Sequence, residues 1–326
     1  MRGLIFHDLF GSPAGMPPTL FLIVNPVAGR ARAMKSLPAV ANYFDRHELE
    51  VDIAESKAPE DIRHLASLAA DRGFQYVLGL GGDGTFRQVV EGIRTKPAIA
   101  GFLPAGNGND IARALGIPPD PVRAADAFLR SYPRPIDLVR VRSSLGESFY
   151  TCAGGVGLDA EAAHLANTRF RKMPGATRYL AGALWAFVAG RTAFQLDAQI
   201  DDVRWSGRAI LAVVANAPWY GSGLCIAPRA RLDDGWLEVV LVRELPFPRL
   251  LEAIPILLAS GDLRFSEVER FRCRRAVFQT DRPMKVHGDG ELLGDSPVEF
   301  QVVPQAVRVM TPVRPLGPSA QESISP

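Results

Sequence analysis

The sequence predicts a protein of two domains, in which an α/β domain with a parallel sheet precedes a β-sandwich domain. The length of 326 residues is sufficient for two domains. In the first half, short apolar runs alternate with segments of helical periodicity, which indicates a parallel sheet covered by helices on both faces. From about residue 136, strand-like stretches follow one another with few helices between them. That pattern favours antiparallel strands packed as a sandwich.

We expect four parts along the chain. They are a loose extension over residues 1–18, the α/β domain over 19–137, the sandwich over 138–312, and a disordered, Pro/Ser-rich tail over 313–326. Whether the last strand of the sandwich returns to the first domain is left open.

Each strand expected in the first half is a continuous apolar run that ends at a turn. Three such runs have the composition of strands buried on both faces: Leu20–Val24, Tyr76–Leu80 and Ala98–Leu103. Between the first two, Ser56 is placed to cap a helix whose first turn contains Pro59.

In the second half of the sequence we predict six strands, which are separated by turn signals, and two helices that lie between some of them. The strands are expected over residues 136–142, 149–153, 208–216, 236–242, 276–280 and 298–303. The helices are expected near 174–190 and 247–260. Both are rich in Leu, Ile, Val and Phe, which fits either core packing or a groove for acyl chains.

Composition excludes several classes of function. The formal net charge of +2 argues against a general nucleic-acid binder. Three cysteines without a CxxC spacing suggest neither a zinc site nor a disulfide scaffold. The N-terminus lacks the apolar core of a signal peptide, and the apolar segment 179–189 falls short of the ~20 residues of a membrane span. We therefore expect a soluble, cytoplasmic protein, with peripheral contact at the inner membrane left open.

Basic residues gather in two clusters that could be solvated faces or contacts for anionic headgroups. The clusters are Arg169, Arg171, Lys172 and Arg178, and then Arg264, Arg270, Arg272, Arg274 and Arg275.

A glycine-rich turn over residues 79–85 follows a strand and opens a helix, which is a geometry that binds phosphate. It spells G-x-G-x-x-G, but the next strand carries no acid, so a Rossmann dehydrogenase is disfavoured. A Walker loop is also excluded, because Met34 stands where its second glycine is required. Asp83 lies at the phosphate position and would repel a bare phosphate. Its presence suggests a magnesium ion between the two, unless it merely caps the helix.

Two further polar loops end strands of the same predicted sheet. One runs from Asn25 to Gly29, and the other from Leu103 to Asp110. Because the carboxyl ends of parallel strands share one edge of a sheet, the three loops together predict a nucleotide site there.

Two acids are separated by one glycine in the second half, at Asp289 and Glu291. In an extended chain their side chains point to the same side, so both could serve one site as proton acceptor and metal ligand. The alternative is a plain Asp-Gly hairpin. His287 stands beside them, but no second histidine lies at ligand spacing.

The motifs N-P-x-x-G, G-G-D-G-T and a P-x-G-T-x-N-D-like loop, in this order, resemble the diacylglycerol kinase catalytic domain of bacterial lipid kinases, a family that includes the sphingosine kinases. NAD kinases and phosphofructokinases share the related first domain. The resemblance spans roughly residues 19–312 and implies that ATP and Mg²⁺ bind at the loops. The nucleotide-binding residues that we infer are Asn25, Pro26, Val27, Ala28, Gly29, Ser56, Gly81, Gly82, Asp83, Gly84, Thr85, Gln88, Gly106, Asn107, Asn109 and Asp110.

The sequence departs from the family pattern at three of these positions. Threonine is usual where Ser56 and Asn107 stand, and both replacements keep hydrogen-bonding capacity. Glutamate is usual where Gln88 stands, so this position loses a charge and any metal-binding or catalytic role there is in doubt.

The family also has a D-G-E motif near its C-terminal end, which residues 289–291 match. The resemblance implies Glu291 as proton acceptor, with Asp289 assisting it or acting as the base itself, and Asp83 near the magnesium. It further implies a structural magnesium held by the Asp234 carboxylate and by the carbonyls of Arg231 and Trp236, where the alternative is a hairpin without metal. Asp159, in a glycine-rich stretch, is expected to cap a helix.

These observations predict an ATP-dependent lipid kinase that transfers the γ-phosphoryl group to the hydroxyl of a lipid at a membrane surface. An NAD kinase-like enzyme is the nearest alternative. A lipid- or nucleotide-binding homologue with impaired catalysis is another, motivated by Gln88 and Asn107. The sequence does not identify the lipid, and a homodimer is left open.

Overall fold

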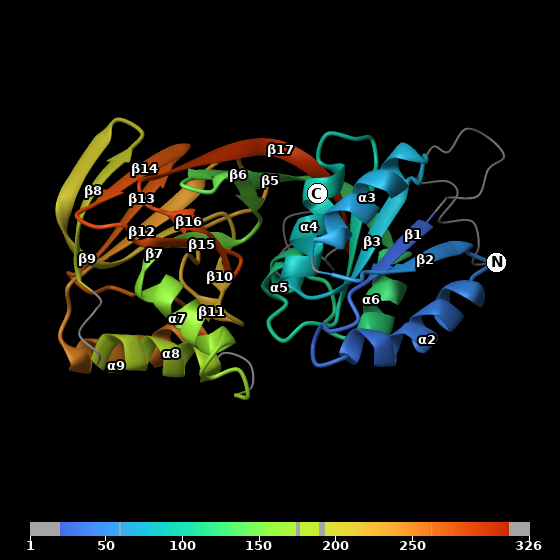
Figure 1. The fold of residues 1–326 in the computed structure, drawn as a ribbon, viewed down its shortest axis with the longest axis horizontal. Helices are drawn as coiled ribbons and strands as arrows, with labels where there is room; N and C mark the ends of the chain where they lie inside the picture. The colour runs from blue at the N-terminus through green and yellow to red at the C-terminus, as the bar shows by residue number, and fades with distance from the viewer. Residues whose placement is uncertain (1–19, 59, 174–176, 189–192, 262, 313–326) are drawn as a thin grey trace, which may run out of the picture.

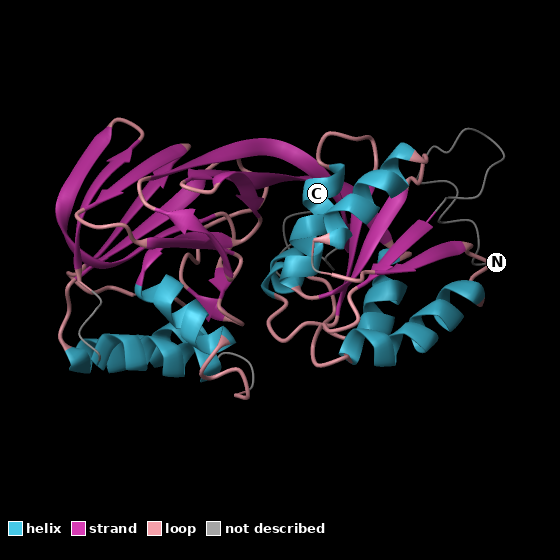
Figure 2. Ribbon diagram, viewed as in Figure 1, coloured by secondary structure: helices cyan, strands magenta, loops and turns pink. Residues whose placement is uncertain are grey.

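The computed structural model describes residues 20–58, 60–173, 177–188, 193–261 and 263–312. The extension predicted over 1–18 and the tail predicted over 313–326 lie outside these ranges. The described chain forms two lobes, a mixed helix–strand lobe and a strand-rich lobe with helices on one side (Figures 1 and 2). The predicted fold class, an α/β domain followed by a β-sandwich-like domain, is confirmed.

The first lobe contains a parallel sheet with the strand order β4-β3-β1-β2. Its strands are β1 (Leu20–Val24), β2 (Val51–Glu55), β3 (Tyr76–Gly81) and β4 (Ile99–Pro104). The accompanying helices are α2 (Arg32–Asp45), α3 (Asp61–Asp71), α4 (Asp83–Ile93), α5 (Asp110–Leu115) and α6 (Pro121–Phe128). Asp120 caps α6 by accepting the N–H groups of Val122 and Arg123, with Pro121 in the first turn.

Two local expectations in this lobe are corrected. The sequence did not predict β2, because this edge strand is only partly buried and has no continuous apolar run. Ser56 does not cap the helix that follows. Its N–H donates to the Val24 carbonyl, and α3 begins only at Asp61, whose carboxylate accepts the N–H groups of Lys57 and Ala58.

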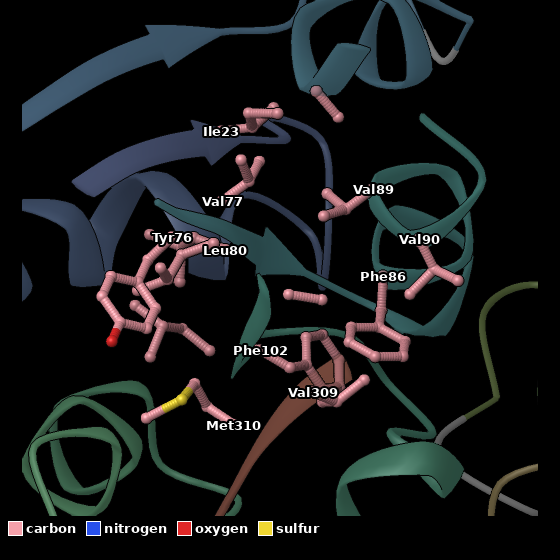
Figure 3. Close-up of a cluster of buried hydrophobic side chains, with 14 of the residues drawn as sticks. Ile23, Tyr76, Val77, Leu80, Phe86, Val89, Val90, Phe102, Val309 and Met310 are labelled. Carbon is pink, nitrogen blue, oxygen red and sulfur yellow. The ribbon is translucent and has the colours of Figure 1, made fainter. Parts of the chain in front are cut away.

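The core of the first lobe lies between the sheet and its helices (Figure 3). Phe86 of α4 packs on Phe102 of β4 with ring centroids 5.0 Å apart. Val309 and Met310, from the far end of the chain, are buried in the same cluster. Packing of this core fixes α4, and therefore the glycine-rich turn that precedes it.

The second lobe is built mainly of antiparallel strands. They are β5 (Ser131–Ser143), β6 (Gly146–Tyr150), β7 (Ala153–Gly157), β8 (Phe194–Ile200), β9 (Val203–Ala215), β10 (Trp219–Tyr220), β11 (Leu224–Cys225), β12 (Leu237–Arg243), β13 (Val268–Cys273), β14 (Arg275–Thr280), β15 (Lys285–Gly288), β16 (Glu291–Asp295) and β17 (Val298–Pro312). Helices α7 (Leu158–Asn167), α8 (Thr177–Val188) and α9 (Phe247–Ala259) lie along one side of these strands (Figure 2).

The strand expected over 149–153 is interrupted. β6 ends at Tyr150 and β7 begins at Ala153, so Thr151 and Cys152 form a break between the two strands. Strands β8, β13, β15 and β16 were not predicted.

The lobes are joined by two long strands that run alongside each other. β5 and β17 pair antiparallel over most of their lengths, and Val309 of β17 also aligns in parallel with Ala100 of β4. Residues 137 and 138, where we expected a domain boundary, therefore lie inside β5. Within the described ranges, no helix has the length and apolar character needed to cross a bilayer.

Candidate functional site

The three loops at the strand ends meet at one edge of the parallel sheet. The Asn25 carboxamide donates to the Thr85 hydroxyl at 3.0 Å, which joins the first loop to the second. The Gly106 N–H donates to the Gly81 carbonyl at 3.0 Å, which joins the third loop to the second. Gly29 has φ +57°, and a Cβ there would lie 1.9 Å from the Ala105 carbonyl oxygen. Only glycine permits this approach of the first loop to the third.

The remaining residues predicted to bind nucleotide surround this junction. The Asn109 side chain both donates to and accepts from the Gly106 backbone, and its left-handed backbone opens α5. Asn107 and Val27 are exposed, whereas Ser56 is buried at the end of β2. Gln88 is buried in α4, and its Oε1 has no hydrogen-bond partner among the described residues. A buried acceptor without a partner can accept a hydrogen bond from a bound ligand.

Asp83 occupies the first turn of α4 and faces two other carboxylates. Gly82 holds the N-cap position, and Asp83 Oδ1 accepts the Ile111 N–H at 3.1 Å. Burial, together with the nearby Asp110 and Asp289 carboxylates, raises the pKa of Asp83 to about 7. Burial likewise raises the pKa of Asp110, whose Oδ2 accepts the Ser222 N–H at 2.8 Å. The three acids thus concentrate negative charge beside the phosphate-type turn.

This charge fits a cation shared with phosphate oxygens. Mg²⁺ is usually held by one or two carboxylates together with substrate phosphates and water, rather than by an all-protein cage. Among the described residues, no group of three or more His, Cys, Asp or Glu side chains forms such a cage. Asp83 and Asp110 are therefore the side chains that would hold a nucleotide-bound magnesium.

Asp289 is anchored to the break between β6 and β7. Its carboxylate accepts the Thr151 hydroxyl at 2.6 Å and the N–H groups of Thr151 and Cys152 at 2.7 and 2.8 Å. The N–H of Ala153 adds a contact at 3.4 Å. These donors occupy both oxygens, and they explain why the strand expected over 149–153 is interrupted. Asp289 fixes the turn that carries the second acid.

Glu291 begins β16 and reaches across to the first lobe. Its Oε2 is bound by the Arg87 guanidinium. A Cβ at Gly84 would lie only 2.7 Å from its Oε1. Burial raises the pKa of Glu291, Arg87 opposes this, and Asp289 and Glu91 add to it. Glu291 is therefore placed against the glycine-rich turn, and its raised pKa suits a proton acceptor.

Arg87 was not predicted as a site residue. It is buried one helical turn after Asp83, and its Nη1 donates to Glu91 at 2.8 Å and to the Phe149 carbonyl at 3.4 Å. The i, i+4 spacing of Asp83 and Arg87 on one helix was the available signal. Its partners in the second lobe are distant in sequence, so the spacing alone could not reveal them.

Two hollows border the Asp289–Glu291 turn. A cavity of about 150 Å³ is lined by Asp83, Asp110 and Asp289 and by apolar side chains from α7, α8 and α9. A groove of about 1020 Å³ is lined by polar side chains that include Arg87 and Glu291. The two acids of the turn therefore border different environments.

His287 and Asp159 form a buried pair in the apolar cavity. Nε2 of His287 lies 2.7 Å from Oδ2 of Asp159. Asp159 does not cap α7, because Gly157 holds that position and no side chain makes a capping hydrogen bond. His287 faces Asp159.

At the loop with the predicted structural metal, the Asp234 carboxylate is already paired. Its Oδ1 accepts the Trp236 N–H at 3.1 Å, and its Oδ2 accepts from Arg272 at 2.9 Å. Arg231 lies 3.7 Å from the carboxylate of Asp233. Metal binding by Asp234, Arg231 and Trp236 stays a prediction.

Family comparisons match nearly the whole described chain. Residues 19–141 match the diacylglycerol kinase catalytic domain. Residues 153–311 match the YegS C-terminal NAD kinase beta sandwich-like domain.

Individual proteins support the same assignment. A diacylglycerol kinase of Bacillus subtilis (strain 168) is 27% identical over 295 residues, which cover 89% of this chain and 95% of the relative. A probable lipid kinase YegS-like of Pseudomonas aeruginosa (strain UCBPP-PA14) is 33% identical over 256 residues, or 77% of this chain and 82% of the relative. The crystal structure of a putative diacylglycerol kinase from Bacillus anthracis str. Sterne has the same fold. It gives a TM-score of 0.72 at 20% identity and covers 93% of this chain and 98% of that one. The chain therefore belongs to the family of diacylglycerol kinases and YegS-like lipid kinases.

Proposed function

We propose that this protein transfers the γ-phosphoryl group of ATP to a hydroxyl of a lipid of the diacylglycerol type. The observation that carries the proposal is the apolar cavity lined also by Asp83, Asp110 and Asp289. An acyl chain fits the apolar walls, and the carboxylates lie where a polar headgroup would meet the nucleotide loops. A kinase that phosphorylates a small polar acceptor does not need a cavity with apolar walls.

The residues divide the reaction between the lobes. The loops at Asn25–Gly29, Gly81–Thr85 and Gly106–Asp110 bind the phosphates through backbone N–H groups and the N-terminus of α4. Glu291 accepts the proton of the lipid hydroxyl while the oxygen of that hydroxyl forms a bond to the γ-phosphorus. The bond from that phosphorus to the β–γ bridging oxygen breaks, and ADP leaves. Magnesium, held by Asp83 and Asp110, would neutralise phosphate charge and orient the nucleotide.

Glu291 suits this role better than Asp289. Asp289 is held by the Thr151 hydroxyl and by three backbone N–H groups, so its oxygens are already occupied. Glu291 lies against Gly84, and burial raises its pKa, which suits a proton acceptor. The role of Asp289 is then to hold the turn.

The test is a panel assay with labelled ATP and five acceptors: diacylglycerol, phosphatidylglycerol, sphingosine, ceramide and NAD. We expect label in the organic phase with one of the lipids, and a loss of about 10²–10⁴-fold for Glu291→Gln. ATP affinity should be unchanged in this variant, because the nucleotide loops lie in the first lobe. Label in NADP with none in any lipid would overturn the proposal. Binding of nucleotide without turnover of any acceptor would favour the catalytically impaired alternative.

A further inference from the structure

A tight turn of the second lobe reaches the nucleotide loops of the first lobe. It joins β10 to β11, which form a separate two-stranded sheet, and β10 lies against α5 (Figure 1). Within the turn, the Ser222 N–H donates to Oδ2 of Asp110 at 2.8 Å. Ser222 and Gly108 line the apolar cavity together with Asp83. The turn therefore lies where the proposed acceptor cavity meets the proposed site of the phosphates.

The backbone of this turn is left-handed at three consecutive residues. Gly221 and Gly223 have φ angles of +60° and +110°, and Ser222 between them has φ +71°. A left-handed backbone is unfavourable for a residue that carries a Cβ, whereas glycine adopts it freely. A third glycine would therefore suit this backbone better than serine does. Serine at such a position points to a role for its side chain, which is a hydroxyl.

The Ser222 hydroxyl lies beside the Asp83 carboxylate. A Cβ placed on Gly108 would lie 2.9 Å from Oγ of Ser222 and 3.2 Å from Oδ2 of Asp83. The two oxygens thus border the same small space, one from each lobe, at the third nucleotide loop. None of the described residues forms a hydrogen bond with this hydroxyl. Its proton is available to a ligand oxygen that binds between the lobes.

We propose that Ser222 binds the γ-phosphate of ATP and is a further catalytic residue of the phosphoryl transfer. This inference rests on the proposed function. The acceptor cavity opens at this place, so the phosphate that meets the hydroxyl is the one that is transferred. The hydroxyl donates a hydrogen bond to a γ-phosphate oxygen and stabilises the charge that these oxygens carry in the transition state. The contact of the Ser222 N–H with Asp110 holds the hydroxyl in position.

Nucleotide binding tests the contact without any acceptor. ADP lacks the γ-phosphate, whereas the non-transferable analogue AMP-PNP carries it. In titration calorimetry with Mg²⁺, Ser222→Gly and Ser222→Ala should bind AMP-PNP about three- to tenfold more weakly than the wild type. Both variants should bind ADP like the wild type. An equal loss of affinity for both nucleotides, or unchanged affinity for AMP-PNP, would overturn the proposal.

The same two variants separate the hydroxyl from the backbone. Ser222→Gly removes the hydroxyl and suits the left-handed backbone, so its Tm should rise by about 1–3 °C. Ser222→Ala removes the same hydroxyl and keeps the unfavourable backbone, so its Tm should stay near the wild-type value. On the preferred acceptor, kcat should fall about ten- to a hundredfold in both variants. Wild-type kcat in Ser222→Gly would show that the hydroxyl is dispensable and would overturn the proposal.

Gln305 provides a matched control far from the loops. It also has a left-handed backbone, with φ +51°, and lies within β17, where its N–H donates to Asp137. Gln305→Gly should raise the Tm by a similar amount and leave kcat and both nucleotide affinities unchanged. A comparable fall of kcat in this control would overturn the proposal, because glycine substitution alone would then explain the loss.

The binding measurements also distinguish this inference from the proposed function. If the variants lose affinity for AMP-PNP alone but no lipid is phosphorylated by the wild type, the γ-phosphate contact stands and the proposed function fails. If the wild type phosphorylates a lipid and both Ser222 variants match it in kcat and in AMP-PNP affinity, the contact fails alone.

Discussion

Replacing Gly84 with alanine should separate catalysis from stability. Gly84 lies in the first turn of α4, where alanine is the better helix former by about 0.5–1 kcal/mol. The added Cβ meets only Oε1 of Glu291, at 2.7 Å, which is the far end of a flexible side chain. The fold should therefore tolerate the substitution, while the carboxylate of Glu291 is displaced.

The size of the displacement sets the expected loss. Ordinary contact begins at 3.4 Å, so the carboxylate must retreat by about 0.7 Å from its position at 2.7 Å. A misplacement of about 1 Å at a reacting group can reduce the rate about 10²-fold. We expect kcat on the preferred lipid to fall ten- to a hundredfold. The free energy of unfolding should be unchanged or slightly higher.

Steady-state kinetics, ATP affinity and denaturant unfolding of the purified variant provide the measurements. The control is the same substitution in a Glu291→Gln background, where it should reduce kcat very little further. An equal loss in both backgrounds would mean that the new methyl group acts on the nucleotide and not through Glu291. Wild-type kcat in the single variant would refute the placement of Glu291 beside the glycine-rich turn.

Three other substitutions test the surrounding charges. Arg87→Gln removes the cation that lowers the pKa of Glu291, so the acid limb of the pH profile of kcat/KM should move to higher pH. Arg87→Lys keeps the cation and should return the limb to its wild-type position. An unmoved limb in Arg87→Gln would exclude the contact between Arg87 and Glu291. Asp83 has its pKa raised in the folded state, so without magnesium its ionisation should destabilise the fold as pH rises from about 4 through about 7. The Tm of Asp83→Asn should then exceed that of the wild type at pH 8 and match it below pH 4, and lower values at pH 8 would contradict this. Asp289→Asn should lower the unfolding free energy by about 1–3 kcal/mol in chemical denaturation, because an amide cannot accept from all the donors at Thr151 and its neighbours. Wild-type stability would show that the anchor is dispensable.

The sequence predicted the elements whose signal is local. The apolar run Leu20–Val24 became β1 with the same bounds, and the glycine-rich turn opened α4 as expected. β2 was missed because an edge strand that is partly exposed lacks a buried run. The break at Thr151 was missed because it depends on Asp289, more than 130 residues away.

In the candidate site, too, the features with a local signal could be predicted, and those that depend on long-range contacts could not. The three nucleotide loops could be predicted together, because strand ends of a parallel sheet share an edge. The contacts of Glu291 with Arg87 and Gly84 join residues about 200 positions apart, and no spacing rule links them. Ser56 and Asp159 were misread as helix caps. Ser56 instead follows β2 and donates its backbone N–H to the Val24 carbonyl, and the Asp159 carboxylate faces His287.

The crossing strands β5 and β17 have a consequence for how the protein is made. Val307, Val309 and Met310 belong to the core of the first lobe, while Val298, Phe300 and Val302 of the same strand belong to the core of the second. During synthesis the first lobe cannot complete its core until residues near 310 have left the ribosome, which also requires the whole second lobe to have emerged. A fragment that stops at residue 137 would expose the surface against which β17 packs. The two lobes should therefore fold and unfold as one cooperative unit, and separately expressed halves should aggregate or associate with each other.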